Sequence, residues 1–304
     1  MKAFPRHTFR SMSWGLFLAV LAVSLPVSAF ADETRLAETS EEDILVTTIG
    51  GYPLELDLFV PVSDELVPLA IFIHGGGWLG GSRKNVYVDW LLDHGFAVAS
   101  LSYRFSSQAI FPAQLEDCQA SIRWLRVHAK QRGVDPDRFA VLGTSAGGHL
   151  ALMLGVTGNE ASFAGEGSPS LKDSTRVQAV VSYWGPSDFP HRSTNQPQKT
   201  DSPEGSVYRL LGGAVSEDLA RARRASPVSH LDSDDPPLLL IHGAKDQTVF
   251  LDQSERMYQA SRGAGVATQL VVAPDGGHGG AAFADARFKE SVLAFLRRTL
   301  QEVE

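Results

Sequence analysis

The sequence is poor in cysteine, in positive charge and in long apolar runs, and each shortage excludes a class of protein. The single cysteine among 304 residues, Cys118, cannot form an intrachain disulfide, which excludes a disulfide scaffold and a site of clustered thiolates. Lys and Arg number 27 against 35 Asp and Glu, and the net charge of −8 disfavours nucleic-acid binding, which needs a basic surface. The mean hydropathy of −0.06 excludes a polytopic membrane protein. With 43% hydrophobic residues, the chain suits one large α/β domain or two small ones.

The N-terminus has the layout of a secretory signal peptide. Three basic residues precede an apolar run from Trp14 to Val27, and a small-x-small sequence ends at Ala31. The run is shorter than the roughly 20 residues of a membrane span and contains Pro26, so we expect no stable membrane insertion. We therefore predict cleavage of residues 1–31 after Ala31 and a secreted or periplasmic protein. Its charge of −11 would favour solubility and disfavour acidic substrates.

Apolar runs and helical periodicities alternate along the rest of the chain. We expect strands at 43–48, 52–60, 69–73, 96–103, 138–142, 177–183, 238–241 and 268–272, and helices at 86–94, 112–131, 145–154, 253–262 and 284–300. Gly50 and Gly51 between the first two strands predict an antiparallel hairpin. The later alternation predicts an α/β fold with a mostly parallel, doubly wound sheet. Residues 187–235, rich in Pro, Ser, Asn and Gln, fit a lid or substrate-loop insertion, or a surface loop without a role.

The pentapeptide from Gly143 to Gly147 predicts a nucleophile at Ser145. It follows an apolar strand directly and precedes a helical pattern directly, so it forms a tight strand-to-helix turn. Such a turn strains the backbone of the serine and projects its Oγ from the sheet edge. Glycine is needed two residues to either side because strand and helix approach too closely there for a Cβ. Without this context the pentapeptide would be a weak signal.

A second glycine-rich segment, His74 to Trp78, ends the preceding apolar strand. Its three consecutive glycines allow backbone N–H groups to converge on one point, as is needed to stabilise an oxyanion. A phosphate cradle is the alternative use of such a turn, but neither of the usual nucleotide-binding glycine patterns is present.

A nucleophilic serine needs a base and an acid that orients the base. In folds of this kind the chain order is serine, acid, histidine, each on a loop after a strand. His278 lies beyond the last expected strand, and Asp246 follows the strand before it. Asp275 and Asp188 are the alternatives, but Asp275 is too near His278 in sequence and Asp188 follows an earlier strand. We therefore predict Ser145, His278 and Asp246 as a catalytic triad.

Together these motifs resemble a serine carboxylesterase of the α/β-hydrolase superfamily. The similarity runs from about Tyr52 to the C-terminus and includes Tyr103-Arg104 and Ser226-Pro227 beside the motifs above. It extends to hormone-sensitive-lipase-like esterases and, more closely, to the bacterial feruloyl-esterase and acetylxylan-esterase-like branch. The resemblance implies short-chain or carbohydrate-linked esters, acetyl or feruloyl, as small-molecule or polysaccharide-linked substrates, and no cofactor.

The same resemblance implies that the amides of Gly76, Gly77 and Ala146 form the oxyanion hole. Trp78 and Trp184 are candidates to line the substrate pocket, and core packing is an equal alternative for both. No histidine or carboxylate cluster has metal-ligand spacing, so no metal is expected.

One departure from the resemblance concerns the segment before His74. Hormone-sensitive-lipase-like esterases commonly carry a helical cap there, whereas residues 32–73 are mostly taken up by the expected hairpin and buried strand. We therefore expect an open site covered only by the 187–235 insertion. A prolyl-oligopeptidase-like peptidase, an arylformamidase and an inactive binding protein remain alternatives, and the oligomeric state is not predicted.

Overall fold

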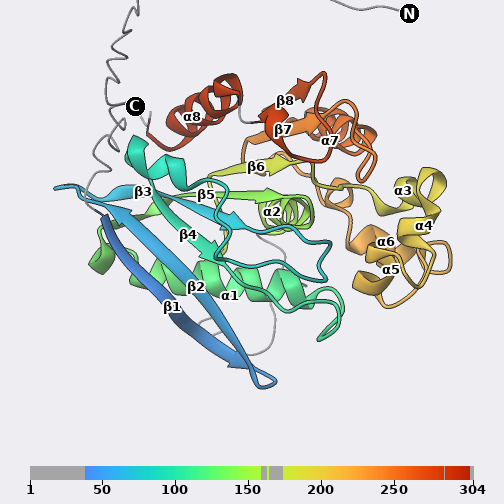
Figure 1. Ribbon diagram of the computed structural model, residues 1–304, viewed down its shortest axis with the longest axis horizontal. Helices are drawn as coiled ribbons and strands as arrows, with labels where there is room; N and C mark the ends of the chain where they lie inside the picture. Colours follow the sequence, from blue (N-terminus) through green and yellow to red (C-terminus); the bar gives the residue numbers. More distant parts are fainter. Residues whose placement is uncertain (1–37, 159–162, 164–173, 284, 302–304) are drawn as a thin grey trace, which may run out of the picture. The chain divides into compact units, whose positions relative to one another are not determined.

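An eight-stranded sheet forms the middle layer of the part of the chain that the structure describes (Figure 1). This computed structural model describes residues 38–158, 163, 174–283 and 285–301, so the expected signal peptide at 1–31 lies outside the described residues. The strands are β1 (Glu38–Ile49), β2 (Tyr52–Pro61), β3 (Val67–Ile73), β4 (Ala97–Leu101), β5 (Val134–Thr144), β6 (Ala179–Tyr183), β7 (Leu238–Gly243) and β8 (Thr268–Ala273).

The order of the strands confirms the predicted α/β-hydrolase sheet. They lie in the order β1-β2-β4-β3-β5-β6-β7-β8. β2 runs antiparallel to both of its neighbours, β1 and β4, and the other described neighbours pair in parallel. The antiparallel hairpin therefore forms one edge of an otherwise parallel sheet, as the sequence predicts.

Helices cover both faces of this sheet. The main ones are η1 (Asp89–His94), α1 (Ala113–His128), η2 (Lys130–Arg132), α2 (Ala146–Val156), α7 (Asp252–Gly263) and α8 (Ala286–Leu300). Successive side chains of a strand point to opposite faces. In β3, Ile71 therefore packs in the core with α1, α2 and α7, and Phe72 packs in a second core with η1 and α8. Within the described residues, no helix combines the length and apolarity that a membrane span requires.

The 187–235 insertion contains short helices rather than an irregular loop. They are α3 (Phe189–Asn195), α4 (Pro197–Thr200), α5 (Ser206–Leu211), α6 (Leu219–Arg224) and η4 (Pro227–Ser229). Figure 1 shows α3 to α6 gathered at one end of the sheet. Two aspartates start these helices by accepting a backbone N–H, Asp188 for α3 and Asp218 for α6. Each helix is too short to show a hydrophobic period, so the sequence pattern indicates only a loop.

The predicted helix at 86–94 is wrong in its extent. Only a 3-10 turn, η1, forms there, and it ends at Gly95, whose φ is +80°. Val86, Tyr87 and Val88 lose side-chain freedom in a helix and stay outside the turn. Buried Leu91 and Leu92 supply the apolar spacing that suggested a longer helix.

Candidate active site

Ser145 lies in the sharp turn between β5 and α2. Its φ is +53° and its ψ is −116°, a backbone conformation that residues other than glycine rarely adopt. The turn is fixed on both sides, because the Ser145 N–H donates to the Tyr183 carbonyl at 2.8 Å and its carbonyl accepts the His149 N–H at 3.0 Å. A Cβ on Gly147 would lie 2.0 Å from the Ile73 carbonyl oxygen. Glycine is thus required where α2 meets the end of β3.

His278 connects Ser145 to Asp246. The His278 imidazole lies on the loop after β8, with Nε2 2.9 Å from the Ser145 Oγ and Nδ1 2.7 Å from the Asp246 Oδ2. The ionised carboxylate can only accept a hydrogen bond, so Nδ1 carries the proton of the neutral imidazole and Nε2 is left to accept a hydrogen bond from the serine hydroxyl. The three predicted side chains form one hydrogen-bonded series, although 133 residues separate Ser145 from His278.

Asp246 is held as an anion by its surroundings. Burial acts to raise its pKa, but hydrogen bonds from His242, His278 and Val249 hold the pKa well below its usual range. The other carboxylate oxygen accepts the N–H groups of Thr248 at 2.8 Å and Val249 at 3.0 Å. The carboxylate is therefore ionised and fixed in orientation before any substrate binds.

The two alternative acids are engaged elsewhere. Asp188 accepts the His191 N–H at the start of α3 and pairs with the Arg256 guanidinium at 2.7 Å. Asp275 is exposed and pairs with Lys245. In the described part of the chain, neither carboxylate forms a hydrogen bond with His278. This agrees with the choice of Asp246 from its place in the chain order.

The glycine-rich segment forms a braced loop beside Ser145. His74 stacks on Tyr103 with ring centroids 4.5 Å apart, and its Nδ1 is 2.7 Å from the Gly75 carbonyl oxygen. Burial lowers the pKa of His74, so its ring stays neutral and supports the loop. Gly76 has φ +114°, and a Cβ there would lie 2.1 Å from the Gly80 carbonyl oxygen.

The three candidate oxyanion donors have no competing acceptor. Among the described residues, the N–H groups of Gly76, Gly77 and Ala146 donate no hydrogen bond. Gly76 and Gly77 line the same cavity as Ser145, whereas Ala146 is buried at the first position of α2 and does not line it. Two of the three candidate donor residues thus lie in the wall of the cavity.

The cavity above Ser145 has a volume of about 590 Å³ and includes both predicted tryptophans. Trp78 is 1% exposed and packs edge-on against His149 and Phe189, so most of its ring belongs to the core. Trp184 lies with its ring centroid 6.1 Å from that of His278. Trp78 and Trp184 share with Ser145 a positive φ, of +58° and +43°. Unusual backbone geometry is therefore concentrated around the cavity.

Several residues that line the cavity do not belong to any of the motifs found in the sequence. Tyr87 comes from the segment wrongly expected to be helical, and Arg192, Lys199 and Ser206 come from the insertion. No motif marks them, since their position depends on how the insertion folds back over the strand ends. Among the described residues, no group of three or more His, Cys, Asp or Glu side chains is placed to hold a metal ion.

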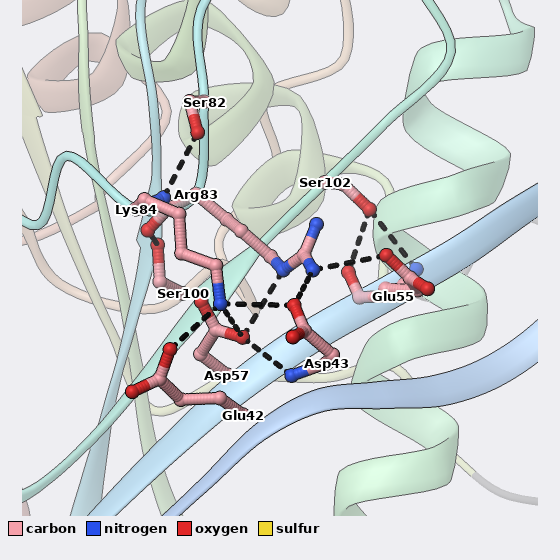
Figure 2. Close-up of polar contacts among 9 residues, drawn as sticks. All are labelled: Glu42, Asp43, Glu55, Asp57, Ser82, Arg83, Lys84, Ser100 and Ser102. Carbon is pink, nitrogen blue, oxygen red and sulfur yellow. Dashed lines mark hydrogen bonds and ion pairs between the residues drawn. The ribbon is translucent and has the colours of Figure 1, made fainter.

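An ion-pair network ties the glycine-rich loop to the β1–β2 hairpin. Figure 2 shows Arg83 and Lys84, a few residues beyond the loop, converging on Asp57. The Asp57 Oδ1 is 3.1 Å from both the Arg83 Nε and the Lys84 Nζ, and it accepts the Asp43 N–H at 2.8 Å. Glu55 also pairs with Arg83, at 2.9 Å. The loop is thus anchored at its far end as well as at His74.

Comparison with known families and proteins identifies relatives of this chain. The BD-FAE family model matches residues 56–260. Two proteins of Mycobacterium tuberculosis are similar to the chain. Esterase LipC is 31% identical over 219 residues, which cover 70% of this chain and 53% of LipC. The probable carboxylic ester hydrolase LipM is 30% identical over 196 residues, covering 62% of this chain and 43% of LipM. The chain thus spans about half the length of these two relatives.

Solved structures share the fold over nearly the whole chain. A truncated carbohydrate esterase from gut microbiota superimposes with a TM-score of 0.81 and 27% identity, covering 89% of this chain and 99% of that one. A bifunctional GH43-CE protein of Bacteroides eggerthii gives a TM-score of 0.78 and 29% identity, covering 86% of this chain and 35% of that one.

Proposed function

Since the chain belongs to the BD-FAE family, we propose that it is a serine carboxylesterase. The observation that carries the proposal is the hydrogen-bonded series from Ser145 through His278 to Asp246, opening on a cavity with free backbone N–H groups. The names of the similar proteins, esterase and carbohydrate esterase, support the same reaction class. An inactive binding protein would have no need for a strained serine aligned with a base.

The proposed reaction proceeds through an acyl-enzyme. The Ser145 Oγ attacks the ester carbonyl while the His278 Nε2 takes its proton, and the Asp246 carboxylate holds the imidazolium that forms. The N–H groups of Gly76 and Gly77, with Ala146, stabilise the negative oxygen of the tetrahedral intermediate. His278 then gives the proton to the leaving alcohol. Water attacks the acyl-enzyme while His278 takes its proton, and His278 passes this proton to the Ser145 Oγ as the acid leaves.

The proposed substrates are short-chain or carbohydrate-linked esters. The cavity is large enough for an acyl group together with part of a sugar, at about 590 Å³. Trp184 and Tyr87 add aromatic surface on which a sugar ring or a feruloyl group can pack. The solved carbohydrate esterase that resembles the chain supports this class of substrate.

Export belongs to the same proposal. A polysaccharide-linked ester lies outside the cytoplasm, which fits the signal-peptide pattern at residues 1–31. The exported protein would then begin at Asp32, which N-terminal sequencing checks.

The test is hydrolysis of 4-nitrophenyl acetate by the wild type and by Ser145→Ala. The variant removes the nucleophile but keeps the backbone, so kcat/KM should fall by about 10³-fold or more while the circular dichroism spectrum stays the same. A Ser145→Ala protein that retains wild-type turnover excludes the proposal. Ser291 is a half-buried serine on α8 that does not line the cavity, so Ser291→Ala is the matched control and should hydrolyse the ester at the wild-type rate.

A further inference from the structure

The cavity above Ser145 is positively charged although the chain as a whole is negative. The basic residues Arg192 and Lys199, both from the insertion, are among those that line it. No Asp or Glu is among the described residues that line it. The charge of −11 expected after signal cleavage led us to predict that acidic substrates are disfavoured, but a ligand in the cavity meets the local charge, which has the opposite sign.

Arg192 is buried without an acidic partner. Its side chain is 2% exposed, and among the described residues it forms no ion pair with a carboxylate. Nε donates to the Gln196 Oε1 at 3.0 Å and Nη2 to the Thr248 carbonyl at 2.8 Å, and both of these acceptors are neutral. Arg104 shows the usual arrangement, with its guanidinium 2.7 Å from the buried carboxylate of Asp117. A desolvated charge without a direct ion pair is costly, and the carboxylates of Asp246 and Asp252 offset this cost only from beyond ion-pair distance. A guanidinium held in this way beside the candidate nucleophile is suited to binding an anionic ligand.

The remaining donors of Arg192 are available to a ligand. An arginine has five N–H groups, and Nη1 donates to no acceptor among the described residues. Burial lowers the pKa of Arg192 to about 10, with the charges of Asp246 and Asp252 opposing this change. The guanidinium therefore stays charged at neutral pH. Lys199 adds a second cation, partly exposed and without an ion pair in the described chain.

We propose that the esterase acts on esters that carry a carboxylate, which Arg192 and Lys199 bind from the insertion side of the cavity. The proposal rests on the function proposed above and narrows its substrate class. A carboxylate suits the free Nη1 of Arg192 because a guanidinium recognises a planar anion through charge-assisted hydrogen bonds. Lys199 contributes a point charge nearer to solvent. The carboxylate belongs either to the acyl group, as in a half-ester of a dicarboxylic acid, or to the alcohol, as in a uronic acid that carries an acetyl group on one of its hydroxyls.

The experiment compares each anionic ester with a neutral one of the same shape. For the acyl side the pair is the monoethyl ester of glutaric acid and ethyl glutaramate. For the alcohol side the pair is a monoacetylated methyl glucuronoside and the corresponding glucuronamide. The readout is the ratio of kcat/KM for the carboxylate to kcat/KM for the carboxamide. A purely structural role of Arg192 in holding the Thr248 backbone would slow both members of a pair alike and leave this ratio unchanged.

We expect the wild type to prefer the carboxylate by about tenfold or more in one of the two pairs, and that pair identifies where the charge lies. Arg192→Gln should bring the ratio close to one, and Lys199→Gln should lower it by a smaller factor. Arg209→Gln removes an exposed charge of α5 outside the cavity and should leave the ratio at its wild-type value.

Three results would overturn the inference. A wild-type ratio of one or less in both pairs, with the carboxamide esters hydrolysed, removes the anionic substrate class and leaves the esterase intact, whether or not the variants fold. A wild-type preference that survives both substitutions removes the assignment to Arg192 and Lys199. Failure of the wild type to hydrolyse any of these esters or 4-nitrophenyl acetate rejects the esterase itself.

Discussion

Backbone positions that few residue types can occupy surround the candidate nucleophile. Trp78, Ser145 and Trp184 all have positive φ values, and each such residue costs roughly 1–3 kcal/mol relative to relaxed backbone. Contacts with the surrounding residues stabilise these unfavourable backbone conformations. Trp78 is held by His149 and Phe189, and the Trp184 N–H donates to the Ile241 carbonyl at 2.7 Å. Substrate therefore meets side chains whose positions are set in advance, which favours catalysis.

Gly147→Ala should destabilise the protein strongly. The new Cβ would lie 2.0 Å from the Ile73 carbonyl oxygen, so α2 must move away from β3 and carry the Ser145 turn with it. We expect a loss of about 3 kcal/mol or more in the free energy of unfolding, measured by urea denaturation. Gly263→Ala is the control, because a Cβ at this last residue of α7 meets nothing within 4 Å. Equal stability of the two variants would contradict the close approach.

The residues of the candidate triad could be predicted because each follows a strand in a fixed chain order. The strand–Gly-x-Ser-x-Gly–helix pattern identified Ser145, and the order of the later loops favoured Asp246 over Asp188 and Asp275. Arg192 could not be predicted in the same way. It is one of several arginines in a polar stretch, and its burial depends on contacts with Gln196 and the distant Thr248.

Among the elements, one carboxylate connects three segments of the insertion that supplies Arg192 and Lys199. Asp201 accepts hydrogen bonds from Ser193 on α3, from Thr200 on α4 and from the N–H of Ser216 beyond α5. Burial acts to raise the pKa of Asp201, but these hydrogen bonds outweigh it and lower the pKa to about 2. The ionised form therefore stabilises the arrangement of the short helices.

Asp201→Asn should weaken the insertion in a pH-dependent way. The pKa is lower in the folded than in the unfolded state, so the stabilisation is complete above the ordinary value of 3.8 and is lost as the pH falls toward about 2. We expect the wild type to melt at a higher temperature than the variant at about pH 6, and the difference to shrink by about pH 3.

The exposed Glu217 provides the control for that experiment, because Glu217→Gln removes a charge of the same region. Its melting temperature should stay near that of the wild type at both pH values. A gap between the wild type and Asp201→Asn that is independent of pH would show that the ionised carboxylate contributes nothing.

The sequence indicates the elements of the sheet better than those of the insertion. Central strands such as β3 and β7 are continuous apolar runs buried on both faces, so their positions follow from composition. The helices of the insertion have three to seven residues and are set by capping and by contacts with distant loops. Local periodicity does not reveal such helices, and at 86–94 it suggested a longer helix than the 3-10 helix that forms at Asp89–His94.

At the scale of the whole molecule, the N-terminal hairpin supports the site although it lies at the far edge of the sheet. Asp57 of β2 is 1% exposed and binds Arg83 and Lys84, which follow the glycine-rich loop (Figure 2). The Arg83 carbonyl also accepts the Ser100 hydroxyl of β4 at 2.7 Å. Distant parts of the fold therefore fix the loop that carries Gly76 and Gly77.

Asp57→Asn should reduce both stability and activity. The change leaves Arg83 with weaker partners, and we expect a loss of about 1–3 kcal/mol in the free energy of unfolding. The looser loop should also lower kcat on 4-nitrophenyl acetate more than it changes KM. Glu42→Gln, at an exposed partner of Lys84, should change neither quantity measurably. If Asp57→Asn is destabilised but keeps the wild-type kcat, the ion-pair network stabilises the fold without positioning the glycine-rich loop for catalysis, which would contradict this prediction.

The central claim is that Ser145 is the activated nucleophile of a serine esterase, and covalent labelling tests it most directly. An organophosphate ester should add one phosphoryl group per wild-type chain, seen by intact-protein mass spectrometry, and peptide mapping should place it on Ser145. Ser145→Ala should stay unlabelled under the same conditions. Labelling of another residue, or ester hydrolysis that continues with Ser145 unlabelled, would contradict the account.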